Sequence, residues 1–531
     1  MTDDCGAQTR LGAVTEVLAL LALFFIYAGD HAPAINEAHY LVKAKNFWDP
    51  TWCGEDLFAA SRKAHVVYYA TFGWLTTMTS LGATAWVGRV VGWLMLAAGL
   101  RFCCRHVGLA PFFSLVVALI WIAGVEYGNL AGEWVIGGIE AKVPAYGLVL
   151  FGFGEIARRR WERAWVWFGI ASAFHVLTGG WAVIAGWLAF LVTERVAKEA
   201  SAEPRVAFFS RGLFLGGFLA LFGLVPAVWL TTGATPEESS EAARIYSYVR
   251  IRHHLLPGDF PAWWFLRHGI VVSAFAAFAF AARLSDASRR MVWVGAGALA
   301  IGGCGLLVGM LPAVAPELAA KLLRYYWFRL SDAVVPLVLG ILVAQALVAS
   351  PFWFKNAARL VLLFAVALTS WSTYCNQRLG LPASTNHRFL GIRPAADVEA
   401  QRRSHQDWIA VCDWIRVATP EDEVFFTPRH QQTFKWYAER AEVVNWKDVP
   451  QDAKSLIEWE KRFDDVYPSR LGRVRVTIQY TELARYRKRY GVRFMVVDNR
   501  IAGNHLPLAK VYPTGEQENA TYSVYEFPYE F

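Results

Sequence analysis

Long apolar runs separated by polar loops dominate the first 375 residues of the chain. Four of these runs carry no charged residue and reach or approach the roughly twenty residues that cross a bilayer as a helix. They lie at 212–236, 291–316, 333–354 and 360–377. With the shorter runs, the pattern predicts about eleven membrane-spanning helices. Their predicted positions are 12–28, 84–101, 110–126, 143–157, 163–176, 178–195, 208–230, 264–283, 290–312, 333–349 and 358–374.

Two apolar stretches have a less regular pattern. Residues 64–88 carry no formal charge, and we interpret 65–82 as an interfacial or re-entrant helix. Residues 164–193 are also uncharged, but one helix of that length would run about 45 Å, which is longer than the hydrocarbon core. We therefore split this stretch near 174–180. His175, which lies there, is expected to be a packing histidine that donates to a backbone carbonyl.

The basic residues fix the predicted orientation. Arg158, Arg159 and Arg160, the loop around Arg195 and the turn at Lys355 fall on one side of the spans, as in short cytoplasmic loops. The N-terminus is then cytoplasmic. Four segments and the tail 376–531 face outward. The segments are 29–83, 127–142, 231–263 and 313–332, here called loops 1 to 4.

Composition supports a membrane protein. Only 18% of the 531 residues are charged, whereas soluble domains carry about 25%. The net charge of +8 is interpreted as basic loops that face anionic lipid headgroups. No basic stripe with interleaved aromatic residues occurs, so nucleic acid is not an expected partner.

The polar tail has the pattern of a separate domain. Residues 406–417, 429–438 and 480–490 are predicted helices, and the predicted strands are 423–427, 442–446, 493–497, 509–512 and 522–527. Alternating strands and helices indicate a small α/β domain with an antiparallel edge. The fold class is therefore mainly α, a polytopic transmembrane domain at 1–375 followed by an extracytoplasmic α/β domain at 376–531.

Loop 1 holds the candidates for catalysis. Asp30 and Glu37 follow the first span directly, where a carboxylate reaches a membrane-embedded headgroup. One is a candidate general base for an acceptor hydroxyl, and the pair are candidate ligands of a divalent cation such as Mg²⁺ or Mn²⁺. The sequence leaves open which acid is the base. The alternative is that both acids cap helices in the loop.

The other loops supply candidates for substrate binding. Acidic groups near an apolar boundary are costly unless they are paired or used, and guanidinium groups hold phosphate oxygens in two-point contacts. Glu140 with Lys142 could instead form a local pair, and Arg329 could pair with Asp332. The substrate-binding candidates are His65, Glu133, Glu140, Lys142, Arg250, Arg252, His253 and Arg329.

This arrangement resembles the GT-C superfamily of integral membrane glycosyltransferases. The resemblance consists of an acidic first loop with Asp30 and Glu37, a second acidic loop, a late basic loop and an outward α/β tail. It implies a sugar donor carried on polyprenyl phosphate, a catalytic or metal-binding carboxylate in loop 1, and a phosphate contact from Arg252 or Arg329. The family's adjacent acidic pair or DxD is absent, since the two acids are seven positions apart.

The tail resembles an uncharacterised family of bacterial membrane proteins, which carries no assigned activity. The similar positions are 419–420, 426–428, 437–440 and 445–447. The expected function is an inverting glycosyltransferase of a bacterial inner membrane, with membrane lipids and the lipid donor as partners and no cofactor besides a divalent cation. A transporter or lipid flippase is one alternative. A non-enzymatic envelope scaffold is the other.

Overall fold

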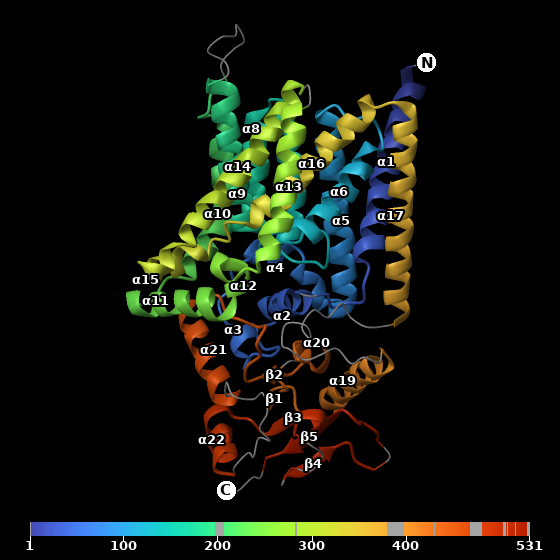
Figure 1. Ribbon diagram of the computed structural model, residues 1–531. Helices are drawn as coiled ribbons and strands as arrows, with labels where there is room; N and C mark the ends of the chain where they lie inside the picture. The colour runs from blue at the N-terminus through green and yellow to red at the C-terminus, as the bar shows by residue number, and fades with distance from the viewer. Residues whose placement is uncertain are drawn as a thin grey trace.

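The structure is a computed structural model. It describes residues 2–34, 36–196, 206–281, 284–379, 398–429, 431–467, 480–502, 506, 508–515 and 517–527. A long helical bundle forms one end, and a smaller domain with a β-sheet forms the other (Figure 1). The N-terminus lies at the end of the bundle that is farther from the sheet.

Each of the predicted spans coincides with a helix of the bundle. Within the described residues, seven helices are long and apolar enough to cross a membrane, and 113–128 is a shorter apolar helix. The helices are thus compatible with a membrane protein. The bundle helices are α1 (Thr2–Ala28), α5 (Leu81–His106), α6 (Phe113–Gly128), α7 (Lys142–Ala157), α8 (Trp161–Phe174), α9 (Val176–Phe190), α10 (Arg211–Trp229), α13 (Ala262–Ala281), α14 (Asp286–Val308), α16 (Arg329–Ala349) and α17 (Phe352–Leu379).

Helix α7 is at the centre of the bundle. Nearly all of its side chains are buried, including those of Lys142 and Glu155, as expected of a helix that is apolar on every side. Small residues let the neighbouring helices approach each other closely. At Gly169 of α8, an added Cβ would lie 2.1 Å from the carbonyl oxygen of Gly216 in α10, so only glycine fits there.

The predicted break in residues 164–193 is confirmed. Helix α8 ends and α9 begins at His175, whose extended backbone (φ −146°, ψ 101°) interrupts the helix. The stretch 65–82 contains the short helix α4 (Val66–Thr71) and the 3₁₀ turn η1 (Gly73–Thr77). The 27-residue α1 is thus followed by short elements before α5 begins at Leu81.

Short elements of the loops cover the end of the bundle that faces the sheet domain (Figure 1). Most are less than three turns long, so their stability comes from packing rather than from helix propensity. They are α2 (Glu37–Trp48), α3 (Leu57–Ala60), α11 (Pro236–Arg244), the π-helix η3 (Ile245–Arg250), α12 (Arg252–Leu255), the 3₁₀ turns η4 (Pro257–Asp259) and η5 (Leu311–Ala313), and α15 (Pro316–Leu323). A π-helical turn, η2 (Leu191–Val196), extends α9.

The C-terminal domain holds a mixed five-stranded sheet in the order β2-β1-β3-β5-β4. Strand β1 pairs in parallel with β2 and β3, whereas β5 is antiparallel to β3 and β4. The predicted antiparallel edge is therefore present. The strands are β1 (Val424–Phe426), β2 (Ala441–Glu442), β3 (Phe494–Asp498), β4 (Ala509–Tyr512) and β5 (Tyr522–Glu526).

Helices pack on both sides of this sheet and differ in part from the prediction. Helix α20 begins later than predicted, β2 is shorter, and α21 was not predicted. The buried side chains of α21, Leu456, Trp459 and Phe463, have the spacing of one helix face. The helices are α19 (Val398–Ala418), α20 (Phe434–Ala438), α21 (Ala453–Val466), α22 (Tyr480–Tyr490) and α23 (Asn499–Ala502).

Candidate functional site at the loop end of the bundle

Glu37 is held in a buried ion pair with Arg89 of α5. The guanidinium binds the carboxylate at two points, with Nε to Oε1 at 2.6 Å and Nη2 to Oε2 at 2.6 Å. The same oxygens accept from the backbone amides of Ile139, at 2.8 Å, and Ala34, at 2.6 Å. Both side chains are fully buried. Because donors surround both oxygens, Glu37 ties loop 1 to α5 and loop 2.

Asp30 has a different environment. It follows α1 by two residues and is partly exposed, and within the described residues its carboxylate makes no hydrogen bond or ion pair. Burial raises the pKa of Asp30, and the nearby Arg89 and His31 oppose that rise. A carboxylate with a raised pKa and free oxygens suits a general base, so the geometry distinguishes Asp30 from Glu37.

The two acids of loop 1 do not fit a divalent-cation site as they are placed. Arg89 occupies the oxygens of Glu37 that a metal ion would need. Within the described parts of the chain, no group of three or more His, Cys, Asp or Glu side chains is arranged to hold a metal ion. No step of the chemistry considered below is therefore assigned to a metal.

Four of the predicted binding residues converge in one buried network, here called the Lys142 cluster. Lys142 Nζ lies 3.0 Å from Glu133 Oε1 and 3.0 Å from Glu140 Oε1. Arg329 Nε lies 3.1 Å from Glu133 Oε2, and Asn36 donates to Glu140 Oε2 at 2.9 Å. Two acids balance two bases, which is what permits burial of all four charges. Arg329 pairs with Glu133 rather than with Asp332.

Two histidines extend this network. Arg329 Nη1 lies 2.9 Å from His175 Nε2, and because a guanidinium only donates, His175 accepts there. Its Nδ1 caps α9, since the Thr178 backbone amide donates to it at 3.2 Å, and it also lies 3.0 Å from Thr178 Oγ1. His65 stacks on His175 with ring centroids 5.0 Å apart. Burial, with Arg329, lowers the pKa of His65 to about 4, so His65 is neutral. The ring nitrogens of His175 thus contact Arg329 and Thr178.

Loop 3 separates residues that the sequence placed together. Arg250 is buried, and its Nε donates to the carbonyl oxygen of Trp446 in the C-terminal domain at 2.7 Å. Arg252 points to the exposed side and pairs with Asp259. His253 is partly exposed, and its ring centroid lies 4.2 Å from that of His254. Arg250 and Arg252 therefore have different surroundings, because the π-helical turn ends at Arg250 and α12 begins at Arg252.

The C-terminal domain is attached to loop 1 by a buried group of charges, here called the Lys435 cluster. Lys435 Nζ lies 3.0 Å from Asp56, 2.7 Å from Glu442 and 2.8 Å from Asp448. Asp448 also contacts His39 Nδ1 at 3.1 Å. Lys435 and His39 hold the pKa of Asp448 well below its ordinary value, although burial opposes them. Sequence reasoning missed these contacts, since 379 positions separate Asp56 from Lys435.

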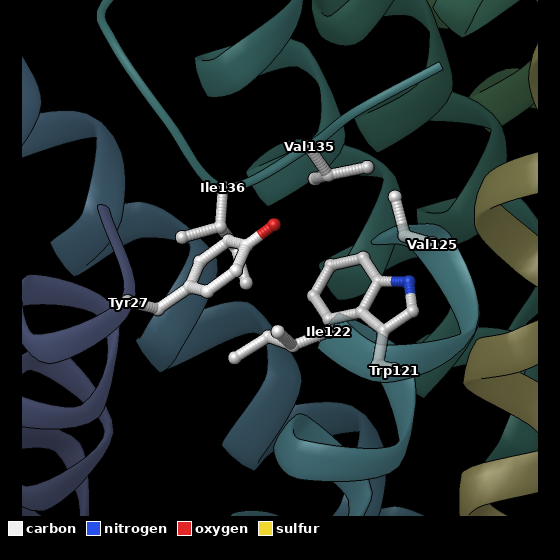
Figure 2. A pocket seen from close by; sticks show the side chains of 6 residues that line it. All are labelled: Tyr27, Trp121, Ile122, Val125, Val135 and Ile136. Atoms are coloured by element: carbon white, nitrogen blue, oxygen red, sulfur yellow. The ribbon is translucent and has the colours of Figure 1, made fainter. Parts of the chain in front are cut away.

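An apolar pocket lies beside the C-terminal end of α1. Figure 2 shows Tyr27 from α1 facing Ile136 of loop 2, with Trp121, Ile122 and Val125 from α6 and Val135 completing the lining. Tyr27 donates to Glu126 Oε2 at 2.7 Å. The lining is largely apolar, and Tyr27 precedes Asp30 by three positions in the sequence.

Residues 406–466 match a family described as a domain of unknown function (DUF6798). No curated protein matches the chain. The matched segment runs from within α19 through β1, α20 and β2 to the end of α21. It contains Lys435, Glu442 and Asp448, so the part of the tail that contacts loops 1 and 3 is the part that the family covers.

Proposed function

We propose that the chain is a GT-C-type glycosyltransferase that moves a sugar from a polyprenyl-phosphate donor to an acceptor outside a bacterial inner membrane. The observation that carries the proposal is Asp30, an unpaired carboxylate with a raised pKa at the outer end of a membrane helix. Arg250, at the same end of the bundle, is buried without an acidic partner among the described residues and supplies positive charge for a phosphate.

The proposed reaction is an inverting transfer. Asp30 takes the proton of the acceptor hydroxyl while that oxygen attacks the anomeric carbon of the sugar. The bond from this carbon to the phosphate oxygen breaks, and polyprenyl phosphate leaves with the bonding electrons. Arginine groups stabilise the charge that develops on the departing phosphate. Glu37 keeps loop 1 in position through Arg89 rather than taking the proton.

The test is turnover of a polyprenyl-phosphate sugar by the purified protein in nanodiscs, measured as released polyprenyl phosphate. Release in the presence of acceptor, and none from a sample in which Asp30 is replaced by asparagine, supports the proposal. Binding without release under every acceptor condition would count against an enzyme.

The acid side of the pH profile gives a second test. Only ionised Asp30 accepts a proton, and its pKa is raised above the ordinary aspartate value by burial. We therefore expect kcat/KM to fall as the pH drops through this raised pKa, at a higher pH than an exposed aspartate would require. A profile that stays flat down to the ordinary aspartate pKa of about 4 would exclude Asp30 as the base.

A lipid flippase is the second candidate. The helix break at His175 favours it, because interrupted helices with polar groups inside the bundle occur in transporters. Proteoliposomes separate the two activities. A flippase moves the intact lipid between leaflets without releasing phosphate, whereas a transferase cleaves the sugar from its lipid.

We further propose that the N-terminus is cytoplasmic and the C-terminal domain extracytoplasmic. Arg158 and Arg160 follow α7, which begins at Lys142, and Lys355 follows α16, which begins at Arg329, so these bases lie at the end of the bundle away from the Lys142 cluster, as the positive-inside rule favours. Alkaline phosphatase fused after residue 531 is expected to be active and a fluorescent protein fused there to be dark. An inactive alkaline phosphatase fusion together with a fluorescent fusion would show that the C-terminal domain is cytoplasmic.

A further inference from the structure

Two cations at the junction of loop 3 and the C-terminal domain have no acidic partner within the described residues. Arg250 is buried, and besides the bond from Nε to the Trp446 carbonyl its guanidinium lies over the Trp446 ring, 5.0 Å from the centroid. Lys447 follows Trp446 directly, and its ammonium makes no hydrogen bond or ion pair with any described residue. The two positive charges influence each other, and at this junction Arg250 is buried whereas Lys447 is partly exposed.

The acids near these cations are already engaged. One carboxylate oxygen of Asp448 contacts Lys435 and the other contacts His39. Glu140 gives its oxygens to Lys142 and Asn36. Neighbouring buried charges of the same sign are unfavourable unless a counter-charge accompanies them. An anion from outside the described residues would provide that charge.

The backbone holds Lys447 in place for such a role. The Lys447 amide donates to Asn445 Oδ1 at 2.7 Å, and its carbonyl accepts from the Val449 amide at 3.0 Å. Asn445 is itself buried and bound to Glu442 of the Lys435 cluster at 3.2 Å. These bonds fix the backbone of Lys447, whereas its ammonium makes no hydrogen bond to a described residue.

We propose that Arg250 and Lys447 together bind the phosphate group of a prenyl phosphate, so that the C-terminal domain supplies part of the lipid-phosphate site. This inference rests on the proposed function. The shared chemistry is a phosphate monoester, which free phosphate also presents. The planar guanidinium donates to phosphate oxygens and the ammonium acts as a compact charge. The part of the tail covered by the domain of unknown function then has a ligand-binding role.

The pH dependence of binding follows from the groups that face Lys447. Burial, with Arg250, lowers the pKa of Lys447 to about 8. Binding should therefore weaken as the pH rises through this value, because the ammonium loses its charge, while a phosphate monoester is already fully ionised above its second pKa of about 6. The charged and titratable neighbours of Lys447 are Arg250, His253, Asp448, His39 and Glu140. Burial lowers the pKa of His253 to about 3, so His253 is neutral across this range.

Binding of farnesyl phosphate to the full-length protein in phosphatidylcholine nanodiscs tests the inference. We expect Lys447→Met to weaken binding by roughly 10- to 100-fold, the usual effect of losing a hydrogen bond to a charged group, and to remove the loss of binding near pH 8. Lys454→Met, an exposed lysine of the same domain, is the matched control and should bind as the wild type does. Unchanged unfolding of Lys447→Met would show that the fold is retained.

The other outcomes separate the sources of phosphate and the two proposals. Equal binding of farnesyl phosphate by Lys447→Met and wild type would overturn the inference and leave the glycosyltransferase proposal standing. Inorganic phosphate that binds as tightly as farnesyl phosphate would overturn a lipid ligand, whereas farnesol that competes as well as its phosphate would overturn a phosphate site. No binding by the wild type would count against the proposed function together with the inference.

Discussion

Replacing Lys435 by methionine is expected to loosen the C-terminal domain from loop 1 and to lower the free energy of unfolding by roughly 3–5 kcal/mol, the usual cost of breaking a buried ion pair. The lysine is almost fully buried and is the ammonium that three buried carboxylates share. Methionine fills a similar volume but leaves Asp56, Glu442 and Asp448 without their cation. Because burial already raises the pKa of Glu442, that acid is expected to take up a proton first.

Cys53 reports the loosening directly. It is a free, buried thiol in loop 1, close enough to Lys435 that this lysine influences its pKa. We expect a water-soluble maleimide to label Cys53 faster in Lys435→Met than in wild type. Lys454→Met is the control and should label at the wild-type rate. Adding Asp56→Asn to Lys435→Met should recover part of the stability, because one uncompensated charge is removed. Unchanged labelling and stability in Lys435→Met would show that the cluster does not hold the domain.

Much of the fold could be predicted from local pattern alone. Apolar runs and their lengths located the bundle helices, because the bilayer imposes both a length and a composition. The break at 174–180 followed from length, although the structure shows that the residue responsible is His175, which ends one helix and caps the next. Helix α21 was not predicted, although the sequence carries its pattern, since Leu456, Trp459 and Phe463 recur on one helix face.

The site was predictable only as a list of candidates. Loop membership identified Glu133, Glu140, Lys142 and Arg329, and these converge because their helices meet at one end of the bundle. Pairing was not predictable, because a local pattern cannot tell that Glu37 meets Arg89 rather than remaining free. One signal was available. An arginine inside an apolar span requires a buried partner, and Arg89 is such an arginine.

Exchanging the two acids of loop 1 for their amides is expected to give opposite results. Glu37→Gln should destabilise the protein by roughly 3–5 kcal/mol, because Arg89 would be left buried without a counter-charge. The new amide group would also face the donors of Ala34 and Ile139, which now meet carboxylate oxygens. Loss of activity in this variant is expected to follow the loss of folded protein, and activity per folded molecule should fall less than in Asp30→Asn.

Asp30→Asn is expected to keep its stability within about 0.5 kcal/mol, because the carboxylate has no partner to lose among the described residues and surface-type changes cost little. Transfer should fall by roughly 10²- to 10⁴-fold, the usual contribution of a general base. Released polyprenyl phosphate and thermal unfolding, measured on the same nanodisc samples, separate the two effects. Asp30→Glu is the companion variant, since it retains a carboxylate and should retain measurable transfer. Full activity in both Asp30→Asn and Glu37→Gln would exclude loop 1 as the source of the base and would leave the flippase as the better explanation of the bundle.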